Sequence, residues 1–347
     1  MKTAIILFNL GGPDRLDAVR PFLNNLFRDP AILRVPALLR WLLSWLIARR
    51  RAEGAKRIYA KIGGSSPLLA ETEKQAAALQ NMLSGAGGEE LRVFVAMRYW
   101  HPFVSDVAGR VAAFAPDRTV LLPLYPQFST TTTASSFREW HHQASERNLA
   151  TQTLAICCYP AQVNWVACQA DLLLTAISQS NHDTASMRIL FSAHGLPKRI
   201  VASGDPYPDH VNQTAKAIIH TISNRYASLD WAVCYQSRVG PLEWIGPSTD
   251  SEIERAGRDG KALVVVPISF VSEHSETLVE LDMDYRELAE RCGVVQYHRV
   301  PAAGTHPQFI EGLAVMVKSA LRETLQVTSM PLGRICDKQV ETCPCKL

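Results

Sequence analysis

The stretch Leu263-Val264-Val265-Val266 decides the fold class, because four apolar residues follow one another without the alternation of a half-exposed strand. Continuous apolar runs are typical of strands in a parallel sheet that is covered by helices on both faces. Seven more short runs have strand character. The eight strand candidates are 3–9, 91–97, 118–123, 152–157, 187–192, 230–236, 261–266 and 294–298.

Amphipathic stretches of helical length separate these runs. Strands that alternate with helices indicate an α/β protein with doubly wound parallel sheets. Eight strands in two sets of four, in a chain of 347 residues, predict two domains. The helical patterns include 68–83, 103–114, 134–147, 162–178, 208–226, 274–290 and 306–323.

The predicted domain limits follow from this order. The first domain covers residues 1–150 and carries an insertion at 29–67, and the second covers 151–304. Residues 305–347 form a C-terminal helix and a cysteine-containing tail, which we expect to pack back on the first domain.

Composition excludes several classes of protein. A hydrophobic fraction of 47% with 20% charged residues is globular, and a net charge of +3 gives no reason to expect nucleic-acid binding. The longest apolar run, Trp41 to Ala48, is far shorter than the roughly 20 residues of a membrane span. The first residues lead directly into a strand and have no signal character, so we expect a cytoplasmic protein.

The insertion at 29–67 is unusually rich in large apolar residues, two tryptophans among them, and in arginine. One interpretation is a buried helical hairpin. The other is an apolar lip that binds a membrane surface or a hydrophobic ligand, because tryptophan beside basic residues is typical of the interface with anionic headgroups. The arginines are Arg34, Arg40, Arg49, Arg50 and Arg51.

His194 is the most informative single residue of the chain. It follows the buried strand 187–192 and precedes Gly195, so it lies where open α/β sheets bind ligands. A lone histidine is more often structural, but this position favours a functional role. No Gly-x-Gly-x-x-Gly or P-loop pattern occurs, so nucleotide binding has little support.

Five acidic residues follow the strand 261–266 at intervals of three or four, which would place them on one face of an α-helix. Such a row is usually a solvated surface. Here few basic residues lie nearby in the sequence, so the row suits a proton or cation path, and crowding would raise some of the carboxyl pKa values. His274 lies beside it. The row is Glu273, Glu276, Glu280, Asp284 and Glu287.

Three of the eight cysteines, Cys336, Cys343 and Cys345, crowd into the last twelve residues. Packing explains them poorly, so they predict a tetrahedral zinc site or an iron–sulfur cluster, with a disordered tail as the alternative. A fourth ligand is needed, and Cys157 and Cys158 at the end of a strand are the nearest candidates.

Several motifs together resemble the ferrochelatase family, from residue 8 to about 285 and in the expected order. They are Asn9-Leu10-Gly11-Gly12-Pro13, Gly63-Gly64-Ser65-Ser66-Pro67-Leu68, Leu122-Pro123-Leu124-Tyr125-Pro126-Gln127-Phe128-Ser129, Phe191-Ser192-Ala193-His194-Gly195-Leu196-Pro197, Asp205-Pro206-Tyr207-Pro208, Tyr235-Gln236-Ser237-Arg238-Val239-Gly240-Pro241 and Pro267-Ile268-Ser269-Phe270-Val271-Ser272-Glu273-His274-Ser275-Glu276-Thr277-Leu278.

The resemblance implies an enzyme that inserts Fe²⁺ into protoporphyrin IX to form protohaem. It implies two Rossmann-like domains with the active site between them, His194 as the catalytic base and Glu276 as the essential carboxylate. It also implies a membrane-facing lip, here residues 29–51, which would place a cytoplasmic protein on the inner face of the membrane.

The expected site extends from these two residues. Glu280 and Asp284 would continue a proton relay from Glu276, and His194 and Glu276 would be transient ligands of the iron. The other expected substrate-binding residues include apolar walls for a buckled porphyrin and arginines for its propionates. They are Leu10, Arg50, Arg51, Ser66, Tyr99, Tyr125, Tyr207, Trp244, Phe270 and His274.

Some members of the family carry a [2Fe–2S] cluster on a C-terminal tail and one internal cysteine. Animal-type tails read Cys-x2-Cys-x4-Cys, whereas this one reads Cys-x6-Cys-x-Cys. By resemblance to bacterial cluster-bearing members we favour Cys158 over Cys157 as the fourth ligand.

Two alternatives to a protoporphyrin ferrochelatase stay open. One is a chelatase for coproporphyrin or another metal, although the apolar lip favours the more membrane-soluble protoporphyrin. The other is a haem- or cluster-binding redox or sensor protein, which would have no need of an acidic relay. A monomer and a homodimer both fit the sequence.

Overall fold

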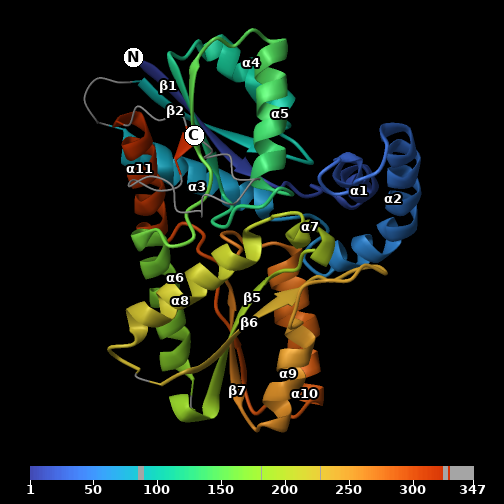
Figure 1. Cartoon of the computed structure of the whole chain (residues 1–347), viewed down its shortest axis with the longest axis vertical. Coiled ribbons are helices and arrows are strands. Elements are labelled where there is room, and N and C mark those ends of the chain that lie inside the picture. Colours follow the sequence, from blue (N-terminus) through green and yellow to red (C-terminus); the bar gives the residue numbers. More distant parts are fainter. Residues whose placement is uncertain (85–89, 181, 227, 323–326, 329–347) are drawn as a thin grey trace. The chain divides into compact units, whose positions relative to one another are not determined.

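The computed structural model describes residues 1–84, 90–180, 182–226, 228–322 and 327–328. The chain divides into two compact units (Figure 1). The first contains Met1–Cys158 and the described residues from Leu313 onward, and the second contains Tyr159–Gly312. Each unit is built on a parallel sheet of its own, which confirms the predicted α/β fold class.

The sheet of the first unit has the strand order β2-β1-β3-β4-β9, and all its strands are parallel. Strand β1 is buried at every position after Lys2, as expected for an apolar run between two helical layers. Four of these strands are predicted from the sequence, and the two-residue β9 adds a fifth at the end of β4. The strands are β1 (Lys2–Asn9), β2 (Glu90–Met97), β3 (Arg118–Pro123), β4 (Gln152–Ile156) and β9 (Val327–Thr328).

Helices connect these strands and cover the sheet. Helix α3 packs on β2, and α4 packs on both β2 and α5. The bounds of α3 are the predicted ones. The elements are η1 (Leu16–Ala18), α3 (Leu68–Leu83), α4 (Val104–Phe114), α5 (Thr133–Glu146) and α11 (Pro307–Arg322).

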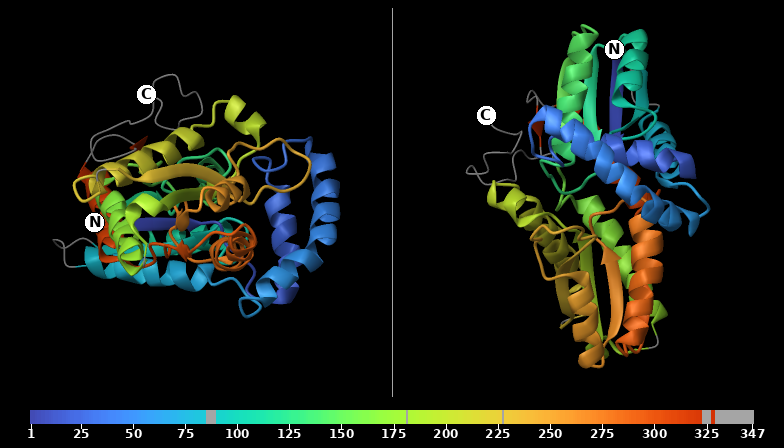
Figure 2. Two further views of the ribbon diagram at one scale, coloured as in Figure 1. Left: turned by 90° about the horizontal axis from the view of Figure 1, so that it is seen from below. Right: turned by 90° about the vertical axis from the view of Figure 1, so that its right-hand side faces the viewer.

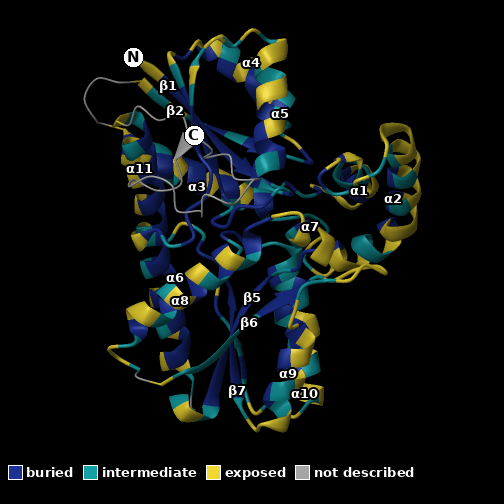
Figure 3. Ribbon diagram, viewed as in Figure 1, coloured by how far each residue is buried: buried dark blue, intermediate teal, exposed yellow. Residues whose placement is uncertain are grey.

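The insertion forms one long helix, α2 (Ala37–Ala60), which packs against α1 (Val19–Arg28) beside the sheet (Figure 2). Small residues such as Ala48 and Ala52 are buried, whereas Leu38 is 84% exposed and Trp41 is 56% exposed. Figure 3 shows much of α2 coloured as exposed. The buried-hairpin interpretation is therefore wrong, because the helix does not fold back and its large apolar residues face outward. No helix in the described parts of the chain is long and apolar enough to cross a membrane.

The sheet of the second unit has the order β6-β5-β7-β8, again with all strands parallel. Every residue of β7 is buried, which agrees with the apolar run that predicts it. Strand β5 extends beyond its predicted end to His194. The strands are β5 (Met187–His194), β6 (Asp230–Gln236), β7 (Ala262–Pro267) and β8 (Tyr297–Arg299).

Helices lie on both sides of this sheet. Figure 1 shows α6 and α8 together on one side of β5, β6 and β7, with α9 and α10 together on the other. The predicted α-helix at 274–290 is instead a π-helix, η3 (Glu276–Asp284), that continues into α10. The remaining elements are α6 (Val163–Gln179), η2 (Thr184–Ser186), α7 (Lys198–Ala202), α8 (Tyr207–Ile222), α9 (Thr249–Arg258) and α10 (Tyr285–Arg291).

Candidate active site

Polar side chains gather at the carboxyl edge of the second sheet. His194 is the last residue of β5, and in the parallel register it pairs with Gln236, the last residue of β6. The π-helix η3 begins a few residues after the end of β7. Because parallel strands end at the same edge, residues far apart in the sequence meet here, as the rule for open α/β sheets predicts.

His194 and Glu276 form the centre of this group. The Nδ1 atom of His194 lies 2.8 Å from Oε2 of Glu276, and the two side chains are 42% and 26% exposed. Burial alone would lower the pKa of His194, but the adjacent carboxylates of Glu276 and Glu280 raise that pKa above its ordinary value.

The two carboxyl groups of the site differ in their affinity for protons. Burial would raise the pKa of Glu276, but His194 and His274 and the hydrogen bonds from His194 and Ser237 lower it. For Glu280, burial and the nearby charge of Glu276 raise the pKa. Pairs of titratable groups whose pKa values are pushed apart are typical of acid–base sites.

Ser237 links the two carboxyl groups. Its Oγ lies 3.0 Å from Oε2 of Glu276 and 2.5 Å from Oε2 of Glu280, and its backbone N–H donates to Oε1 of Glu280 at 2.8 Å. Its φ of +60° lies in the left-handed region, which non-glycine residues seldom adopt. The surrounding contacts therefore hold Ser237 in an uncommon conformation that brings its hydroxyl between both carboxyl groups.

The predicted acidic row forms only in part, because Glu276 and Glu280 meet at Ser237 but the two end members have other partners. Glu273 precedes the π-helix and is held by Arg299 at 2.7 Å and by the backbone N–H of Ala302. Glu287 lies in α10 and pairs with Arg291 on the surface. Arg299, distant in the sequence, therefore neutralises part of the acidic charge.

Aromatic residues lie near the pair. The ring of Phe270 is 4.7 Å from that of His274, and burial lowers the pKa of His274. A Cβ on Gly195 would lie 3.2 Å from Trp244 and 3.0 Å from the backbone oxygen of Gln236, so a larger residue here would push these neighbours away from His194. Tyr207, buried at the start of α8, donates its hydroxyl to Ser269.

Comparison with known proteins decides the family. A family model described as Ferrochelatase matches residues 2–321. This chain belongs to the ferrochelatase family. The second unit therefore carries the histidine and glutamate of the family resemblance at hydrogen-bond distance from each other.

Ferrochelatases from several bacteria are similar to this chain over almost its whole length. The ferrochelatase of Caulobacter vibrioides is 51% identical over 346 residues, covering 99% of this chain and 98% of that protein. The ferrochelatase of Pelagibacter ubique is 43% identical and covers 99% of both chains.

Solved chelatase structures share the fold. SirB from Bacillus subtilis with Fe³⁺ has a TM-score of 0.55 at 12% identity, covering 93% of this chain and 96% of that chain. The sirohydrochlorin chelatase SirB in complex with cobalt has a TM-score of 0.52 at 11% identity, covering 92% of this chain and 95% of that chain. At this identity the likeness concerns the fold alone.

The first unit carries the other predicted substrate-binding residues. Arg50 and Arg51 are exposed on α2, and Leu10 follows β1. Tyr99 is only 1% exposed, and its hydroxyl donates to the buried Asp29. As the structure stands, Tyr99 is part of a core cluster rather than an open wall. Ser66 and Tyr125 are half-buried in loops of the same unit.

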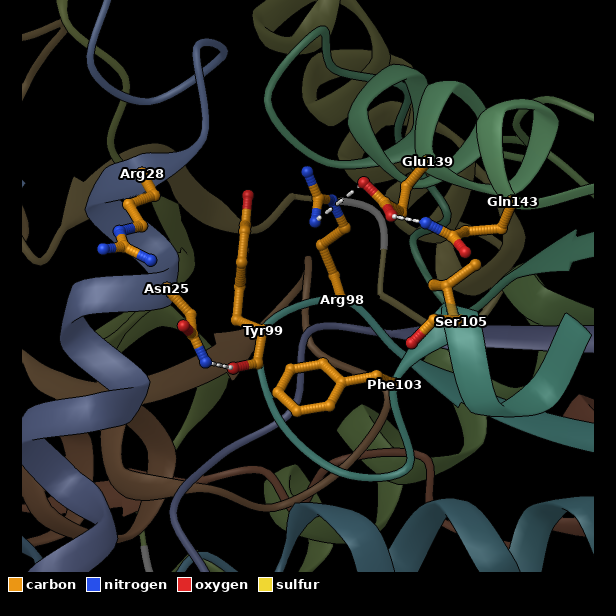
Figure 4. Close-up of a pocket in the computed structure, with 9 residues that line it drawn as sticks. Asn25, Arg28, Arg98, Tyr99, Phe103, Ser105, Glu139 and Gln143 are labelled. Atoms are coloured by element: carbon orange, nitrogen blue, oxygen red, sulfur yellow. Dashed lines mark hydrogen bonds and ion pairs between the residues drawn. The ribbon is translucent and has the colours of Figure 1, made fainter. Parts of the chain in front are cut away.

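A polar pocket of the first unit opens next to Tyr99 (Figure 4). Asn25 donates to the Tyr99 carbonyl oxygen at 3.2 Å, and Gln143 donates to Glu139 at 3.1 Å. Arg98 lies 3.7 Å from Glu139 and 2.8 Å from Asp29, so acidic partners already balance its charge. Tyr99 is the one predicted site residue among those that line it.

The internal cysteines lie at the end of β4. Cys157 and Cys158 are buried, with 3.5 Å between their sulfur atoms. Cys336, Cys343 and Cys345 lie outside the described residues. Among the residues that the structure does describe, no group of three or more His, Cys, Asp or Glu could hold a metal ion.

Gln236 and Ser237 contact the carboxyl groups of the site but are not among the residues predicted from the sequence. The amide of Gln236 donates to Glu280 at 3.1 Å and to the backbone oxygen of Glu276 at 3.3 Å. Both residues lie in a motif that carries the resemblance. Their position at the end of a strand, the same signal that singles out His194, could have identified them.

Proposed function

We propose that this protein inserts Fe²⁺ into protoporphyrin IX, with His194 as the base that removes pyrrole protons. As a member of the ferrochelatase family it is an enzyme and not a sensor. The observation that carries the assignment of the base is the 2.8 Å pair of His194 Nδ1 and Glu276 Oε2 at the carboxyl edge of the second sheet.

The reaction requires a base. The free porphyrin carries two N–H protons, and both leave as Fe²⁺ enters, so the metalloporphyrin core is neutral. A carboxylate at Nδ1 holds a proton on that nitrogen, which leaves the lone pair of Nε2 as the proton acceptor. The Nε2 lone pair can also replace a water ligand on the incoming iron before it accepts a proton. Glu276 as a second transient ligand stays a prediction, since it would have to leave Nδ1 to reach the same ion.

Ser237 and Glu280 would carry the proton away from His194. The imidazolium passes its Nδ1 proton to Glu276. The Ser237 hydroxyl lies between two carboxyl oxygens but can donate its single proton to only one of them. A proton on the other carboxyl group lets that group donate to Ser237 Oγ, so both contacts become hydrogen bonds. The raised pKa makes Glu280 the acceptor of the relayed proton: protonated Glu276 donates to Ser237 Oγ as the Ser237 hydroxyl donates its own proton to Glu280. Asp284, exposed at the end of the same helix, is the proposed exit to solvent.

Each unit carries some of the predicted substrate-binding residues. In the second unit, Phe270, His274, Trp244 and Tyr207 are the proposed contacts of the macrocycle. In the first, Leu10, Ser66 and Tyr125 stay predicted contacts, and Arg50 and Arg51 are the proposed partners of the propionates. The exposed apolar face of α2 favours protoporphyrin over the more polar coproporphyrin.

The same face of α2 would bind the surface of a membrane and place the protein at its inner, cytoplasmic side. Trp45 lies between two guanidinium groups, with Arg20 at 5.6 Å and Arg49 at 5.5 Å from its ring centre. Exposed tryptophan and leucine beside arginine are the composition of an interfacial helix on anionic lipid.

Replacing Trp41 and Trp45 with serine should lower binding to anionic phosphatidylserine vesicles by about tenfold or more, since each side chain buries apolar surface in the interface. Cosedimentation measures this, and the melting temperature should change little because both side chains are exposed. The control Val163→Ser removes an exposed apolar residue of α6 and should bind as the parent does. Unchanged vesicle binding of the double variant would contradict the proposal.

A [2Fe–2S] cluster is the proposed use of the tail. Strand β9 pairs with the last residues of β4, directly before Cys157 and Cys158, so the chain that leads to the three tail cysteines starts beside the internal pair. Four thiolates are the usual ligand set of such a cluster. Cys336, Cys343 and Cys345 with Cys158 would supply them, and the cluster would fix the tail to the body of the protein.

Cys343→Ser should then bleach a reddish-brown protein and lower its stability, because cluster binding is coupled to folding of the tail. Iron and acid-labile sulfide should each fall from about two per chain. Cys292→Ser is the control and should keep the colour. Replacing Cys157 and Cys158 separately identifies the fourth ligand. Zinc without sulfide in the anaerobically purified protein would overturn the cluster.

An anaerobic insertion assay tests the function as a whole. Purified protein, Fe²⁺ and protoporphyrin IX should shift the Soret band to that of protohaem. Faster insertion into coproporphyrin, or of another metal, would favour the second kind of chelatase, and no insertion at all would contradict the proposal. The domain limits at residues 150 and 304 and the choice between monomer and homodimer stay predictions.

A further inference from the structure

Three polar side chains form a line beneath the candidate active site. Thr249, Ser192 and Gln236 come from α9, β5 and β6, and all three are fully buried. Ser192 Oγ lies 2.9 Å from Thr249 Oγ1 and donates to Gln236 Oε1 at 2.8 Å. The line ends at the carboxyl groups, because Gln236 Nε2 donates toward Glu280 and Glu276.

The hydrogen bonds of this line have one direction. An amide oxygen only accepts, so the single proton of Ser192 is used on Gln236. Thr249 has a single proton and two contacts, Ser192 Oγ at 2.9 Å and Cys234 Sγ at 3.3 Å, and sulfur is the weaker acceptor, so the Thr249 proton satisfies Ser192 only when it is not donated to Cys234. The two protons of the Gln236 amide go to Oε2 of Glu280 and to the carbonyl oxygen of Glu276. From Ser192 onward, every donor in the line points toward the carboxyl pair.

The direction fixes the orientation of the Gln236 side chain. If the amide rotated by half a turn, its oxygen would face a carboxyl group and a carbonyl oxygen, and its NH₂ group would meet Ser192. Electrostatic repulsion between these oxygens would weaken the first turn of the π-helix, where Glu276 and Glu280 lie. Ser192 prevents the rotation by offering a donor at the position where the amide oxygen must be.

We propose that Ser192, supported by Thr249, is a positioning residue that orients Gln236 and through it the Glu276–Glu280 carboxyl pair. The inference rests on the proposed function, because the carboxyl pair is given its role there. Ser192 is fully buried beneath the site, so we expect it to act on the rate of proton removal rather than on binding.

The test is Ser192→Ala in the full-length protein, assayed anaerobically with Fe²⁺ and protoporphyrin IX. Loss of a side chain that orients a reacting group typically costs about 10- to 100-fold. We expect kcat to fall by about tenfold, with KM for porphyrin and for iron unchanged. A fall in melting temperature without a change in kcat would mean that Ser192 has only a packing role and would overturn the inference.

Thr249 supplies a second pair of variants in case Ser192→Ala does not fold. Thr249→Ser keeps the donor and should keep the wild-type kcat, whereas the isosteric Thr249→Val removes it and should lower kcat by less than Ser192→Ala does. Thr214→Val is the matched control, since Thr214 is a buried threonine of α8 that bonds to backbone oxygens. Equal kcat values for Thr249→Ser and Thr249→Val would contradict the proposal.

A measurement without substrate separates this inference from the proposed function. In ¹⁵N-labelled protein the Gln236 side-chain NH₂ protons, assigned by their loss in Gln236→Glu, should exchange slowly with solvent. They should exchange at least about tenfold faster in Ser192→Ala, as expected when a buried hydrogen bond is lost. Unchanged exchange would overturn the inference even if the enzyme inserts iron. Wild-type protein that inserts no iron would contradict the function and leave this result standing.

Discussion

Replacing His194 with alanine lowers the rate of Fe²⁺ insertion by about 100- to 10,000-fold, the usual contribution of a positioned base. The reason is geometric. The Glu276 carboxylate lies 2.8 Å from Nδ1 and holds a proton there, which leaves the lone pair of Nε2 free to accept a proton. Alanine removes this acceptor. The rate is measured as the Soret shift under anaerobic single-turnover conditions, with porphyrin affinity determined by fluorescence.

The fold should survive this substitution, because the side chain is 42% exposed and lies at the end of a strand. Circular dichroism and the melting temperature check this. His220→Ala, an exposed histidine of α8, is the matched control and should insert iron at the parent rate. A folded His194→Ala protein with near-parent turnover would remove His194 from the role of base.

Glu276→Gln is expected to lower kcat by about 100-fold while KM for porphyrin changes by less than about threefold. Glutamine keeps the shape of the side chain and can still accept a hydrogen bond from Nδ1. It cannot take a proton from the imidazolium, and it removes the negative charge that stabilises that ion. The effect should therefore appear in the rate of the chemical step rather than in binding.

Glu290→Gln is a suitable control, because Glu290 is an exposed carboxylate of α10. Full insertion activity is expected for it. If Glu276→Gln raised KM and left kcat intact, Glu276 would be a wall of the binding site, and the proposed relay through Ser237 would be wrong.

The strands could be predicted because they depend on local composition. Continuous apolar runs such as 261–266 are typical of strands in a sheet that helices cover on both faces. The carboxyl ends of such strands mark where ligands bind. From the strand ends alone, His194 and Glu276 are placed near the same edge. Their distance, across a sequence separation of 82 residues, depends on the register of β5, β6 and β7 and needs the structure.

The π-helix could not be predicted from the spacing of its residues. Intervals of three and four residues fit an α-helix, and the wider turn is apparent only when the hydrogen bonds are known. Glu276 and Glu280 lie in the π-helix and meet at Ser237, whereas Glu273 precedes it, Glu287 lies in α10, and both of these have arginine partners. The strand end could have marked the position of Ser237, but its left-handed backbone is set by tertiary contacts and needs the structure.

The long helix α2 shows the opposite limitation. Its composition predicts both a buried hairpin and an apolar lip, because large apolar residues suit either environment. Only the packing of α2 against α1 through small residues such as Ala48 and Ala52 decides which side chains remain exposed. The exposed fraction of a side chain depends on the surface that packs against its helix, so the sequence of that helix alone does not predict it.

The pH dependence of kcat/KM in the parent protein and in Glu276→Gln tests the central claim most directly. This ratio reports on the groups of the free enzyme, and insertion needs the unprotonated imidazole, so activity should rise with pH through the pKa of His194. Glu276 raises that pKa, so removing its charge should move the rise to lower pH. A rise at the same pH in both proteins would contradict the assignment of the His194–Glu276 pair as the base of this enzyme.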